Sequence, residues 1–387
     1  MTRSGDGPSR RIAFLIHDLR HGGAERVTIS LANGMAERGF DVDLVLINKT
    51  GEEAYFESLN PNIRVLPLRQ NRALTSLIGF RTYFEEAKPD VAISALTHVN
   101  VAAALARLTA RHKPRLILVE HNQMSKNIRR KRGFVRLAYA AVPKVYRLAD
   151  VVGVVSEGVK ADFVDVTGLP ADRVQVFHNP VVTPALHAQR QKTPDHPWLQ
   201  DDGPPVILGV GRLTEQKNFS LLIEAFARLR ATRPARLLIL GEGALRDDLE
   251  RQATATGYGD DIALPGFVDN PFACMNHAAV FALSSDWEGL PTVLIEAMAC
   301  GTSVVATNCP SGPDEILQSG ELAPLTPPGD ADALAKGLAQ ALNRQRPVQP
   351  LMQRANDFSL DTTLNRYIQV AWPHHGLGGL PSKNVFR

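Results

Sequence analysis

Short apolar segments alternate with helical segments along most of this chain, and this alternation limits the fold more than any other feature. In the first half, strands are predicted at residues 11–17, 42–47, 63–66, 91–95, 116–119, 151–155 and 174–177. After a polar, Pro- and His-rich stretch, the pattern starts again with strands at residues 206–210, 237–240, 262–264, 280–283 and 304–306. Strands that alternate with helices indicate parallel sheets with helices on both faces, so the sequence predicts an α/β protein.

The length of the chain and the break in this pattern predict two domains. A single hydrophobic core stops growing at about 250 to 300 residues, and this chain has 387. We expect an N-terminal domain at residues 1–180, a linker at 181–204 and a second domain at 205–357. A C-terminal helix at 358–372 is expected to pack back on the first domain, and the Gly- and Pro-rich residues 373–387 are expected to form a disordered tail.

The composition is typical of a soluble globular protein, with 44% hydrophobic and 21% charged residues. The three cysteines follow no metal-binding or disulfide spacing, which favours a reducing compartment. The polar, basic start lacks the apolar core of a signal peptide, and no apolar run reaches the roughly 18 residues of a membrane span. We therefore expect a cytoplasmic protein.

Positive charge is concentrated in the first half of the chain. Residues 1–180 hold 26 Lys and Arg against 18 Asp and Glu, a net charge of +8, whereas the remainder holds 17 against 22, a net charge of −5. Between Glu120 and Asp150 there is no acidic residue, and apolar side chains are interleaved with the basic ones. This pattern predicts a helix with one basic and one apolar face, which is typical of helices that lie on anionic membranes.

The predicted membrane or acceptor face consists of Lys126, Arg129, Arg130, Lys131, Arg132 and Arg136. It would place the protein peripherally at the inner face of the cytoplasmic membrane. An ordinary core helix with a solvated basic face is the alternative interpretation. Nucleic acid is not expected as a partner, because no aromatic residue interrupts the run from Arg129 to Arg132.

Residues 279–306 predict a strand, a loop, a helix and a second strand. Such a loop lies at the carboxyl end of a strand, where open α/β sheets bind their ligands. Between residues 289 and 301 Glu296 is the only acidic side chain on an apolar helix, so its carboxylate would be buried and would need hydrogen-bond donors. An anion bound at the start of this helix would be separated from Glu296 by about the length of one ribose. Glu288 would lie at the opposite end of such a ligand. This geometry suits a sugar–diphosphate–nucleoside, although a structural arginine would also satisfy Glu296.

A second candidate site follows the strand at 206–210. Gly211 lets the backbone approach a ligand, and Arg212 and Lys217 carry charges that can neutralise a diphosphate. A dinucleotide-binding fingerprint requires a third glycine where Thr214 stands. The segment therefore favours a phosphate site that is not of the dehydrogenase type.

The first domain offers two weaker candidates at the ends of its strands. Gly22 and Gly23 open a helix after the first strand, and the pair can also be a simple tight turn. His121 follows the strand at 116–119. A lone histidine is more often structural than catalytic, but the strand-end position makes His121 the better candidate. The histidines ranked below it are His98, His112 and His277.

Together these motifs resemble those of the retaining glycosyltransferases of family 4. The most specific element is the pair Glu288 and Glu296 within Glu-Gly-Leu-Pro-Thr-Val-Leu-Ile-Glu. Gly-Arg-Leu followed by Lys-Asn at 211–218 is similar to the family's diphosphate clamp, and residues 22–26 are similar to the glycine loop of bacterial members that build surface polysaccharides and lipid-linked oligosaccharides. The resemblance runs from about residue 11 to residue 372. It implies the GT-B architecture, in which two Rossmann-like domains face one another with the active site in the cleft between them.

The resemblance also implies roles for individual side chains. Arg212 and Lys217 would hold the diphosphate and stabilise its charge as it leaves. Glu296 would bind the ribose hydroxyls, and Glu288 would lie at the transferred sugar. Phe267 falls where the family stacks or brackets the base.

The first domain would contribute His121, which by the same resemblance touches the donor sugar and completes the catalytic set with Arg212, Lys217 and Glu288. The other implied donor-binding positions are Gly22, Gly23, Gly211, Gly289, Leu290 and Thr292. The two glycines of the first domain would let it close on the phosphates, and backbone N–H groups at the start of the second-domain helix would face them.

The function implied is transfer of a hexose or N-acetylhexosamine from a nucleoside-diphosphate donor, with UDP favoured, to a glycan or lipid-linked saccharide in surface polysaccharide or glycoconjugate synthesis. In this family the leaving phosphate is thought to help deprotonate the acceptor. No metal cofactor is expected. The obvious Asp-x-Asp, Asp41 and Asp43, opens a strand near the amino edge of the sheet and is interpreted as two solvated strand-end acids.

Two other functions remain open at this stage. A sugar-nucleotide epimerase of the same architecture would use water or enzyme carboxylates in place of an acceptor alcohol. A non-catalytic sugar-nucleotide-binding protein would have kept the fold alone, and the intact set of Arg212, Lys217, Glu288 and Glu296 argues against it.

Overall fold

The computed structural model describes residues 10–19, 23–48, 56–68, 73–125, 128, 142–343 and 348–373. The chain divides into two compact units, the first comprising Met1–Pro180 and Leu360–Arg387 and the second Val181–Ser359. The stretch 181–204, expected to be a linker, groups with the second unit and contains helix α7 (Pro184–Gln189). Apart from Pro373, the expected tail lies outside the described residues.

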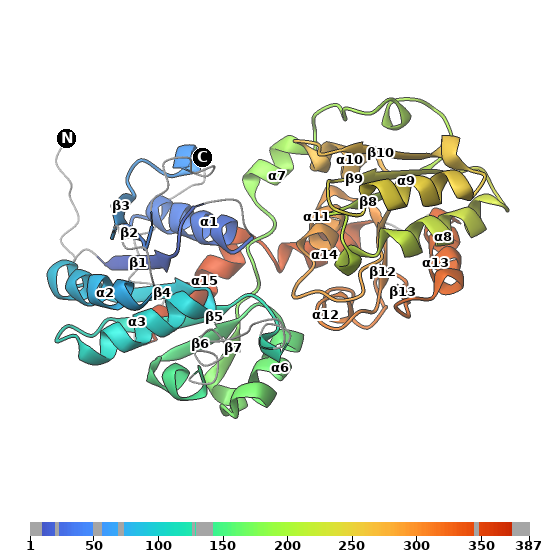
Figure 1. Cartoon of the computed structure of the whole chain (residues 1–387). Helices are drawn as coiled ribbons and strands as arrows, with labels where there is room; N and C mark the ends of the chain where they lie inside the picture. The colour runs from blue at the N-terminus through green and yellow to red at the C-terminus, as the bar shows by residue number, and fades with distance from the viewer. Residues whose placement is uncertain are drawn as a thin grey trace. The chain divides into compact units, whose positions relative to one another are not determined.

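The first unit is built on a seven-stranded parallel sheet with the order β3-β2-β1-β4-β5-β6-β7 (Figure 1). Its strands are β1 (Arg11–Ile16), β2 (Asp41–Leu46), β3 (Arg64–Pro67), β4 (Val91–Ala95), β5 (Arg115–Glu120), β6 (Val151–Val154) and β7 (Val174–Val176). Its α-helices are α1 (Gly23–Glu37), α2 (Ala73–Ala87), α3 (Thr97–Thr109), α6 (Glu157–Thr167) and α15 (Leu360–Ala371). Short 3₁₀ turns occupy Phe56–Ser58, Tyr146–Leu148 (η2) and Ala171–Arg173.

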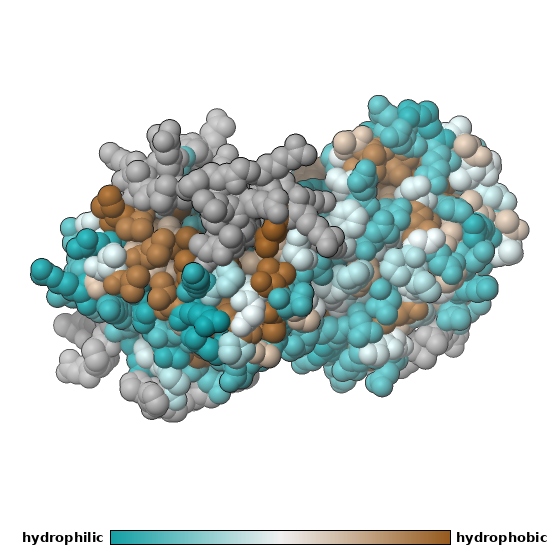
Figure 2. Space-filling model, turned by 60° about the horizontal axis from the view of Figure 1, so that its bottom comes forward, coloured by the Kyte–Doolittle hydropathy of each residue, from teal (hydrophilic) through white to brown (hydrophobic). Residues whose placement is uncertain are grey.

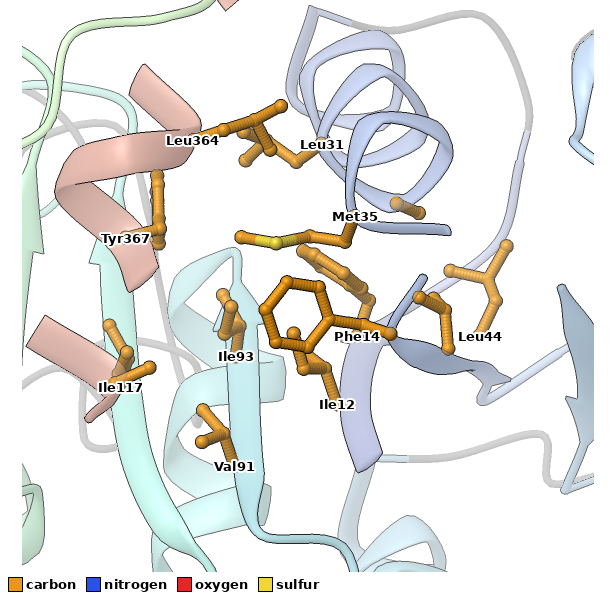
Figure 3. Packing of buried hydrophobic residues seen from close by; sticks show 14 of the residues in the cluster. Ile12, Phe14, Leu31, Met35, Leu44, Val91, Ile93, Ile117, Leu364 and Tyr367 are labelled. Carbon is orange, nitrogen blue, oxygen red and sulfur yellow. The ribbon is translucent and has the colours of Figure 1, made fainter. Parts of the chain in front are cut away.

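One hydrophobic cluster of the first unit lies between the sheet and the helices α1 and α15 (Figure 3). Phe14, Ile93 and Ile117 point from neighbouring strands towards Met35 of α1 and Tyr367 of α15. Central strands of a parallel sheet are buried on both faces, so their sequences are nearly continuous apolar runs. The apolar side chains that predicted these strands therefore also form the core.

Helix α15 packs against α1 although more than 300 residues separate them in the chain. A Cβ atom at Gly34 would lie 2.5 Å from Cδ1 of Leu364, so a larger residue there would require the Leu364 side chain to shift. Arg38 then donates a hydrogen bond of 2.7 Å to the carboxylate of Asp361, and Arg115 donates one of 2.8 Å to the carbonyl of Val370.

The second unit holds a six-stranded parallel sheet with the order β10-β9-β8-β11-β12-β13. Its strands are β8 (Val206–Val210), β9 (Arg236–Leu240), β10 (Ile262–Gly266), β11 (Val280–Leu283), β12 (Ser303–Thr307) and β13 (Leu325–Thr326). Besides α7, its α-helices are α8 (Phe219–Arg230), α9 (Arg246–Ala255), α10 (Pro271–His277), α11 (Thr292–Cys300), α12 (Pro313–Ile316), α13 (Ala331–Asn343) and α14 (Gln349–Asn356). Further 3₁₀ turns occupy Pro197–Leu199, Glu215–Lys217 (η5) and Gly259–Asp261.

The prediction of an α/β protein with parallel sheets is confirmed, because strand pairs throughout the described part are parallel. Strands β4, β8 and β11 have the predicted bounds, most others differ by one residue at one or both ends, and β10 ends two residues later than predicted. The prediction missed β13, which is only two residues long and therefore carries too little pattern to detect.

The surface of the first unit carries some apolar side chains, which Figure 2 shows in brown among the hydrophilic ones. Ile78 on α2 and Leu108 on α3 are 65% and 54% exposed. Among the helices in the described ranges, none combines the length and the apolarity that crossing a bilayer requires.

Candidate active site

The strongest site lies at the carboxyl edge of the second sheet, where β8 and β11 end side by side. The loop after β8 runs through η5 into α8, and the loop after β11 runs through residues 284–291 into α11. Because the two strands are paired and parallel, both loops leave the same edge of the sheet. This edge is where α/β sheets bind ligands.

Hydrogen bonds join the two loops to each other. The backbone N–H of Asp286 donates to the carbonyl of Gln216 at 2.9 Å, and the carboxylate of Asp286 accepts from Nδ2 of Asn218 at 2.9 Å. Ser284 Oγ donates to the carbonyl of Lys217 at 2.8 Å. The position of each loop is therefore fixed by the other.

This arrangement brings Lys217 and Glu288 into contact. Nζ of Lys217 lies 2.6 Å from Oε1 of Glu288, and the two side chains are only 15% and 7% exposed. Oε1 also accepts from the Ser285 hydroxyl at 2.7 Å, and Oε2 accepts from Nε2 of Gln216 at 3.3 Å. A buried carboxylate needs such donors, and here one of them is charged.

Glycines allow the loops to pack this closely. A Cβ atom at Gly211 would lie 3.1 Å from Cε of Lys217, so the lysine stem passes directly over this glycine. A Cβ atom at Gly241, after β9, would lie 1.9 Å from the carbonyl oxygen of Gly211. The predicted close approach of the backbone at Gly211 thus involves a second glycine that the sequence analysis did not select.

Helix α11 begins at Thr292 and ends at Cys300, and Gly301 follows as its C-cap, with a left-handed backbone and φ of 86°. Pro291 precedes the helix as its N-cap. Glu296 is 6% exposed on a helix that is buried from residue 294 to residue 300, so its predicted burial is confirmed.

A third loop, after β12, supports the start of this helix. The hydroxyl of Ser311 donates to the carbonyl of Gly289 at 2.6 Å, and the N–H of Glu288 donates to the carbonyl of Pro310 at 3.4 Å. A Cβ atom at Gly312 would lie 2.3 Å from Cδ of Pro291. The segment that contains Gly289 and Leu290 is therefore supported by residues 310–312.

Two other predicted donor-binding side chains are exposed at the same edge. Arg212 follows β8, and its guanidinium has no ion-pair or hydrogen-bond partner among the residues that the structure describes. Phe267 follows β10 and is 74% exposed. Neither has a structural role that explains its position.

In the first unit, His121 follows β5 and is partly buried. Its ring lines a small cavity together with Phe14 of β1, Thr28 of α1 and Tyr367 of α15. Burial lowers the pKa of His121 to about 4, so the ring is neutral at physiological pH.

Glu120, which directly precedes His121, is 2% exposed and lies in a polar network. Its carboxylate accepts hydrogen bonds from Oγ1 of Thr97 at 3.0 Å, from Nδ2 of Asn100 at 3.2 Å and from the hydroxyl of Tyr146. Burial raises the pKa of Glu120 to about 7 despite these donors.

Other predicted positions are less informative. Gly23 is the first residue of α1, with open space around it, whereas Gly22 lies outside the described residues. The basic face is also outside the described residues, in all six of its positions Lys126, Arg129, Arg130, Lys131, Arg132 and Arg136.

Comparison with known proteins finds similar sequences for both units. A glycosyltransferase family 4 model matches residues 21–183, and a model described as glycosyl transferases group 1 matches residues 191–358. Lipopolysaccharide outer core galactosyltransferase WaaB has the same fold, with a TM-score of 0.73 and 19% identity over 94% of this chain and 100% of that one. The chain belongs to the GT-B glycosyltransferases.

Among the relatives of this glycosyltransferase is the Campylobacter jejuni N-acetylgalactosamine-N,N'-diacetylbacillosaminyl-diphospho-undecaprenol 4-alpha-N-acetylgalactosaminyltransferase. The two are 28% identical over 86% of this chain and 90% of the relative. The lipopolysaccharide core biosynthesis glycosyltransferase LpsE of Rhizobium meliloti is 26% identical over 92% of this chain and 97% of its own. Anabaena HepE, solved in complex with UDP, has a TM-score of 0.75 and 21% identity over 93% and 98% of the two chains.

The Asp-x-Asp of this glycosyltransferase has a structural role, and the interpretation as two solvated acids is wrong for Asp43. Asp43 is 3% exposed, and its carboxylate accepts from Nε and Nη2 of Arg64 at 2.9 and 2.6 Å and from the Tyr83 hydroxyl at 2.7 Å. In the part of the chain that the structure describes, no three His, Cys, Asp or Glu side chains come together as a metal site requires.

The sequence motifs did not identify the residues whose hydrogen bonds connect the loops of the glycosyltransferase site. The polar side chains concerned are Ser284, Ser285, Asp286, Gln216, Asn218 and Ser311. They occupy loops directly after strands, and Pro310 and Gly312 mark the third loop as a turn. Their position after the ends of strands is the signal that could have identified them as candidates.

Proposed function

We propose that this glycosyltransferase is a retaining enzyme that moves a hexose or N-acetylhexosamine from a UDP-linked donor to a lipid-linked saccharide or glycan in surface polysaccharide synthesis. The observation that carries the proposal is the contact of Lys217 with Glu288 at 2.6 Å, next to an exposed arginine and the start of α11. Acceptors bound to diphospho-undecaprenol are named for two of the Campylobacter jejuni relatives, and HepE binds UDP.

The charges of this edge suit a diphosphate. Arg212 supplies an exposed guanidinium, and the N–H groups at the start of α11 supply an anion site of the helix-terminus type. Lys217 is neutralised by Glu288 in this structure. A donor diphosphate would contact the ammonium group of Lys217 together with Glu288. The lysine would then stabilise the negative charge that develops on the diphosphate as its bond to the sugar breaks.

The two glutamates are proposed to bind opposite ends of the donor. Glu288 lies in the loop before α11, four residues before the helix begins, and Glu296 lies in the second turn of α11. Glu296 would accept from the ribose hydroxyls, and Glu288 would contact the transferred sugar. His121, which is neutral, would donate or accept a single hydrogen bond at that sugar.

The test is incubation with radiolabelled UDP-glucose, UDP-galactose, UDP-GlcNAc and UDP-GalNAc and a polyprenyl-diphosphate-linked saccharide acceptor. Transfer of label to the lipid fraction, with an α-linkage by NMR, supports the proposal, because those donors are α-linked. A β-linkage would contradict retention. Epimerised donor without transfer, or binding without any turnover by the wild type, would contradict glycosyl transfer.

A further inference from the structure

A chain of hydrogen bonds runs from the end of β12 to the contact of Lys217 with Glu288. Thr307, the last residue of β12, donates from Oγ1 to the carbonyl of Ser285 at 2.6 Å. The hydroxyl of Ser285 in turn donates to Oε1 of Glu288 at 2.7 Å. The same oxygen accepts from Nζ of Lys217 at 2.6 Å. Ser285 therefore connects the sheet to the pair of charged side chains.

Both hydroxyl-bearing residues of this chain of hydrogen bonds are fully buried. Ser285 and Thr307 are each 0% exposed, and the strands before them, β11 and β12, pair in parallel. Ser285 lies two residues after β11, so its short side chain extends from a backbone that Thr307 holds to the neighbouring strand. A buried hydroxyl that loses its partner finds no water to replace it, so these two hydrogen bonds fix the position of the Ser285 hydroxyl.

The two charged side chains are less restricted by their own covalent structure. A lysine has a flexible four-carbon stem, and the carboxylate of a glutamate rotates broadly at the end of its side chain. Lys217 and Glu288 could therefore move together and still keep their ion contact. The hydroxyl of Ser285 removes this freedom, because Oε1 of Glu288 must stay within hydrogen-bond distance of a group that is fixed to the sheet.

The hydrogen bonds are distributed unevenly over the carboxylate of Glu288. Oε1 accepts from Ser285 and Lys217 at 2.7 and 2.6 Å, whereas the hydrogen bond from Nε2 of Gln216 to Oε2 is 3.3 Å long. Nε2 of Gln216 also donates to the carbonyl of Trp287 at 3.0 Å. A carboxylate offers about four acceptor positions, so Oε2 can accept a further hydrogen bond from a ligand. Ser285 thus determines which oxygen faces the lysine and which one remains for the ligand.

We propose that Ser285 is a positioning residue for glycosyl transfer, with Thr307 as its anchor. Ser285 fixes Oε1 of Glu288, and Glu288 holds the ammonium group of Lys217 where the diphosphate leaves. This inference rests on the proposed function and deepens it. As the bond from the anomeric carbon to the diphosphate breaks, its electron pair stays on the phosphate oxygen. The stabilisation of that charge by Lys217 depends on the distance between the two groups.

The experiment compares variants that remove one hydroxyl with a variant that retains it. Ser285→Ala removes the donor to Glu288, and Thr307→Val removes the anchor with nearly the same side-chain volume. Thr307→Ser is the conservative variant, because it keeps the hydroxyl and loses only a methyl group. The matched control is Thr302→Val, just before β12 and therefore at the opposite end of the same strand. Thr302 is also buried, and its hydroxyl donates to the carbonyl of Met275.

The measurements are kcat and KM for the UDP-sugar that the wild type transfers, the affinity for UDP and the melting temperature. We expect Ser285→Ala to lower kcat by about 10- to 100-fold with KM unchanged, because the hydroxyl acts through Lys217 on charge that develops only in the transition state. UDP affinity should persist, since Arg212 is intact. Thr307→Val should also lower kcat, and Thr307→Ser should keep the wild-type value. Thr302→Val should lower the melting temperature as Thr307→Val does and leave kcat unchanged.

Wild-type kcat in a folded Ser285→Ala variant overturns the proposal. An equal loss of kcat in Thr307→Ser and Thr307→Val also overturns it, because the methyl group and not the hydroxyl would then be responsible. The same holds if Thr302→Val loses as much kcat, since any buried hydroxyl of the second unit would then have this effect. If Ser285→Ala does not fold, the Thr307 variants decide the question. A wild type that binds UDP but transfers no sugar would contradict the proposed function itself, and this inference with it.

Discussion

Nζ of Lys217 and Oε1 of Glu288 lie 2.6 Å apart at the carboxyl edge of the second sheet, and both side chains are largely buried. Removing one partner of a buried pair leaves the other charge uncompensated, which costs about 3 to 5 kcal/mol, whereas removing both can be nearly neutral. Stability and activity should therefore respond differently to the same substitutions.

The first prediction separates these two responses. Lys217→Met should lower the melting temperature of the second unit, and Lys217→Met with Glu288→Met should recover most of that loss. Both variants should lose most of their transfer activity, because both lack the Lys217 charge proposed for the leaving diphosphate, and the double variant also lacks the Glu288 carboxylate proposed to contact the sugar. Thermal unfolding and transfer assays on the two variants provide the measurement. A double variant that is less stable than Lys217→Met would show that the pair is not the buried unit that the structure describes.

The second prediction concerns Arg212, which is exposed and has no ion-pair partner in the described ranges. Losing one charge-assisted contact costs about 1.5 to 3 kcal/mol, or roughly 10- to 150-fold in affinity. Arg212→Ala should weaken UDP binding by that factor in calorimetry without changing the melting temperature. Arg251→Ala, on the outer face of α9 with 70% of its side chain exposed, is the matched control and should bind UDP normally. Equal binding by both variants would remove Arg212 from the site.

Some features of the fold and of the site could be predicted from the sequence, and others could not. Apolar runs give the strands, because parallel strands buried on both faces must be apolar whatever the partner strand is. The sequence also identified four of the site residues, because glycines and charged side chains near strand ends stand out against apolar runs. They are Gly211, Lys217, Glu288 and Glu296. The contact of Lys217 with Glu288 could not be predicted, since nothing in a sequence says that β8 and β11 are neighbours when β9 and β10 lie between them in the chain.

The error on Asp43 has the same origin. From the sequence, Asp41 and Asp43 are alternate residues at the start of a strand, and both look solvated. Asp43 is buried because Arg64 from β3 and Tyr83 from α2 cover it, and both arrive from later parts of the chain.

The third prediction is a pH dependence at the end of β5. Burial raises the pKa of Glu120 from 4.5 to about 7, so the folded protein holds this proton more tightly than the unfolded chain. Stability should therefore fall as the pH rises from about 4.5 to 7. Burial lowers the pKa of His121 from 6.5 to about 4, so this group should reduce stability as the pH falls from 6.5 towards 4.

Glu120→Gln isolates the first effect, because glutamine resembles the protonated acid and can still bond to Thr97, Asn100 and Tyr146. The variant should match the wild type near pH 4.5 and exceed its stability above pH 7, by about 3 kcal/mol for a shift of this size. Hydrogen exchange at the amides of β5 reports the first unit separately from the second. A difference between variant and wild type that does not grow with pH would contradict the assignment.

The fourth prediction is that transfer needs no divalent ion. Lys217, Arg212 and the start of α11 supply positive charge where a metal would otherwise neutralise the diphosphate. Transfer should persist in EDTA at the rate measured with magnesium. Complete loss in EDTA, restored by magnesium or manganese, would mean that the leaving diphosphate is neutralised by a metal ion. EDTA that is already saturated with magnesium is the matched control.

The fifth prediction concerns the membrane and rests on sequence, because the basic face lies outside the described residues. No acidic residue offsets its charge between Glu120 and Asp150, and each Lys or Arg near an anionic surface contributes about 1 kcal/mol. The protein should cosediment with vesicles that contain anionic lipid at low salt, less so as salt screens the charges, and little with neutral vesicles.

Replacing four residues of that face by serine should abolish cosedimentation and leave UDP affinity intact. The residues are Arg129, Arg130, Lys131 and Arg132. The matched control removes four exposed positive charges from elsewhere in the first unit, so that net charge changes equally. The control residues are Arg81, Lys88, Arg111 and Lys113. If both variants lose vesicle binding to the same extent, the net charge of the first unit is responsible. If the wild type ignores anionic vesicles at low salt, the segment is a solvated face and the lipid-linked acceptor must reach the enzyme without it.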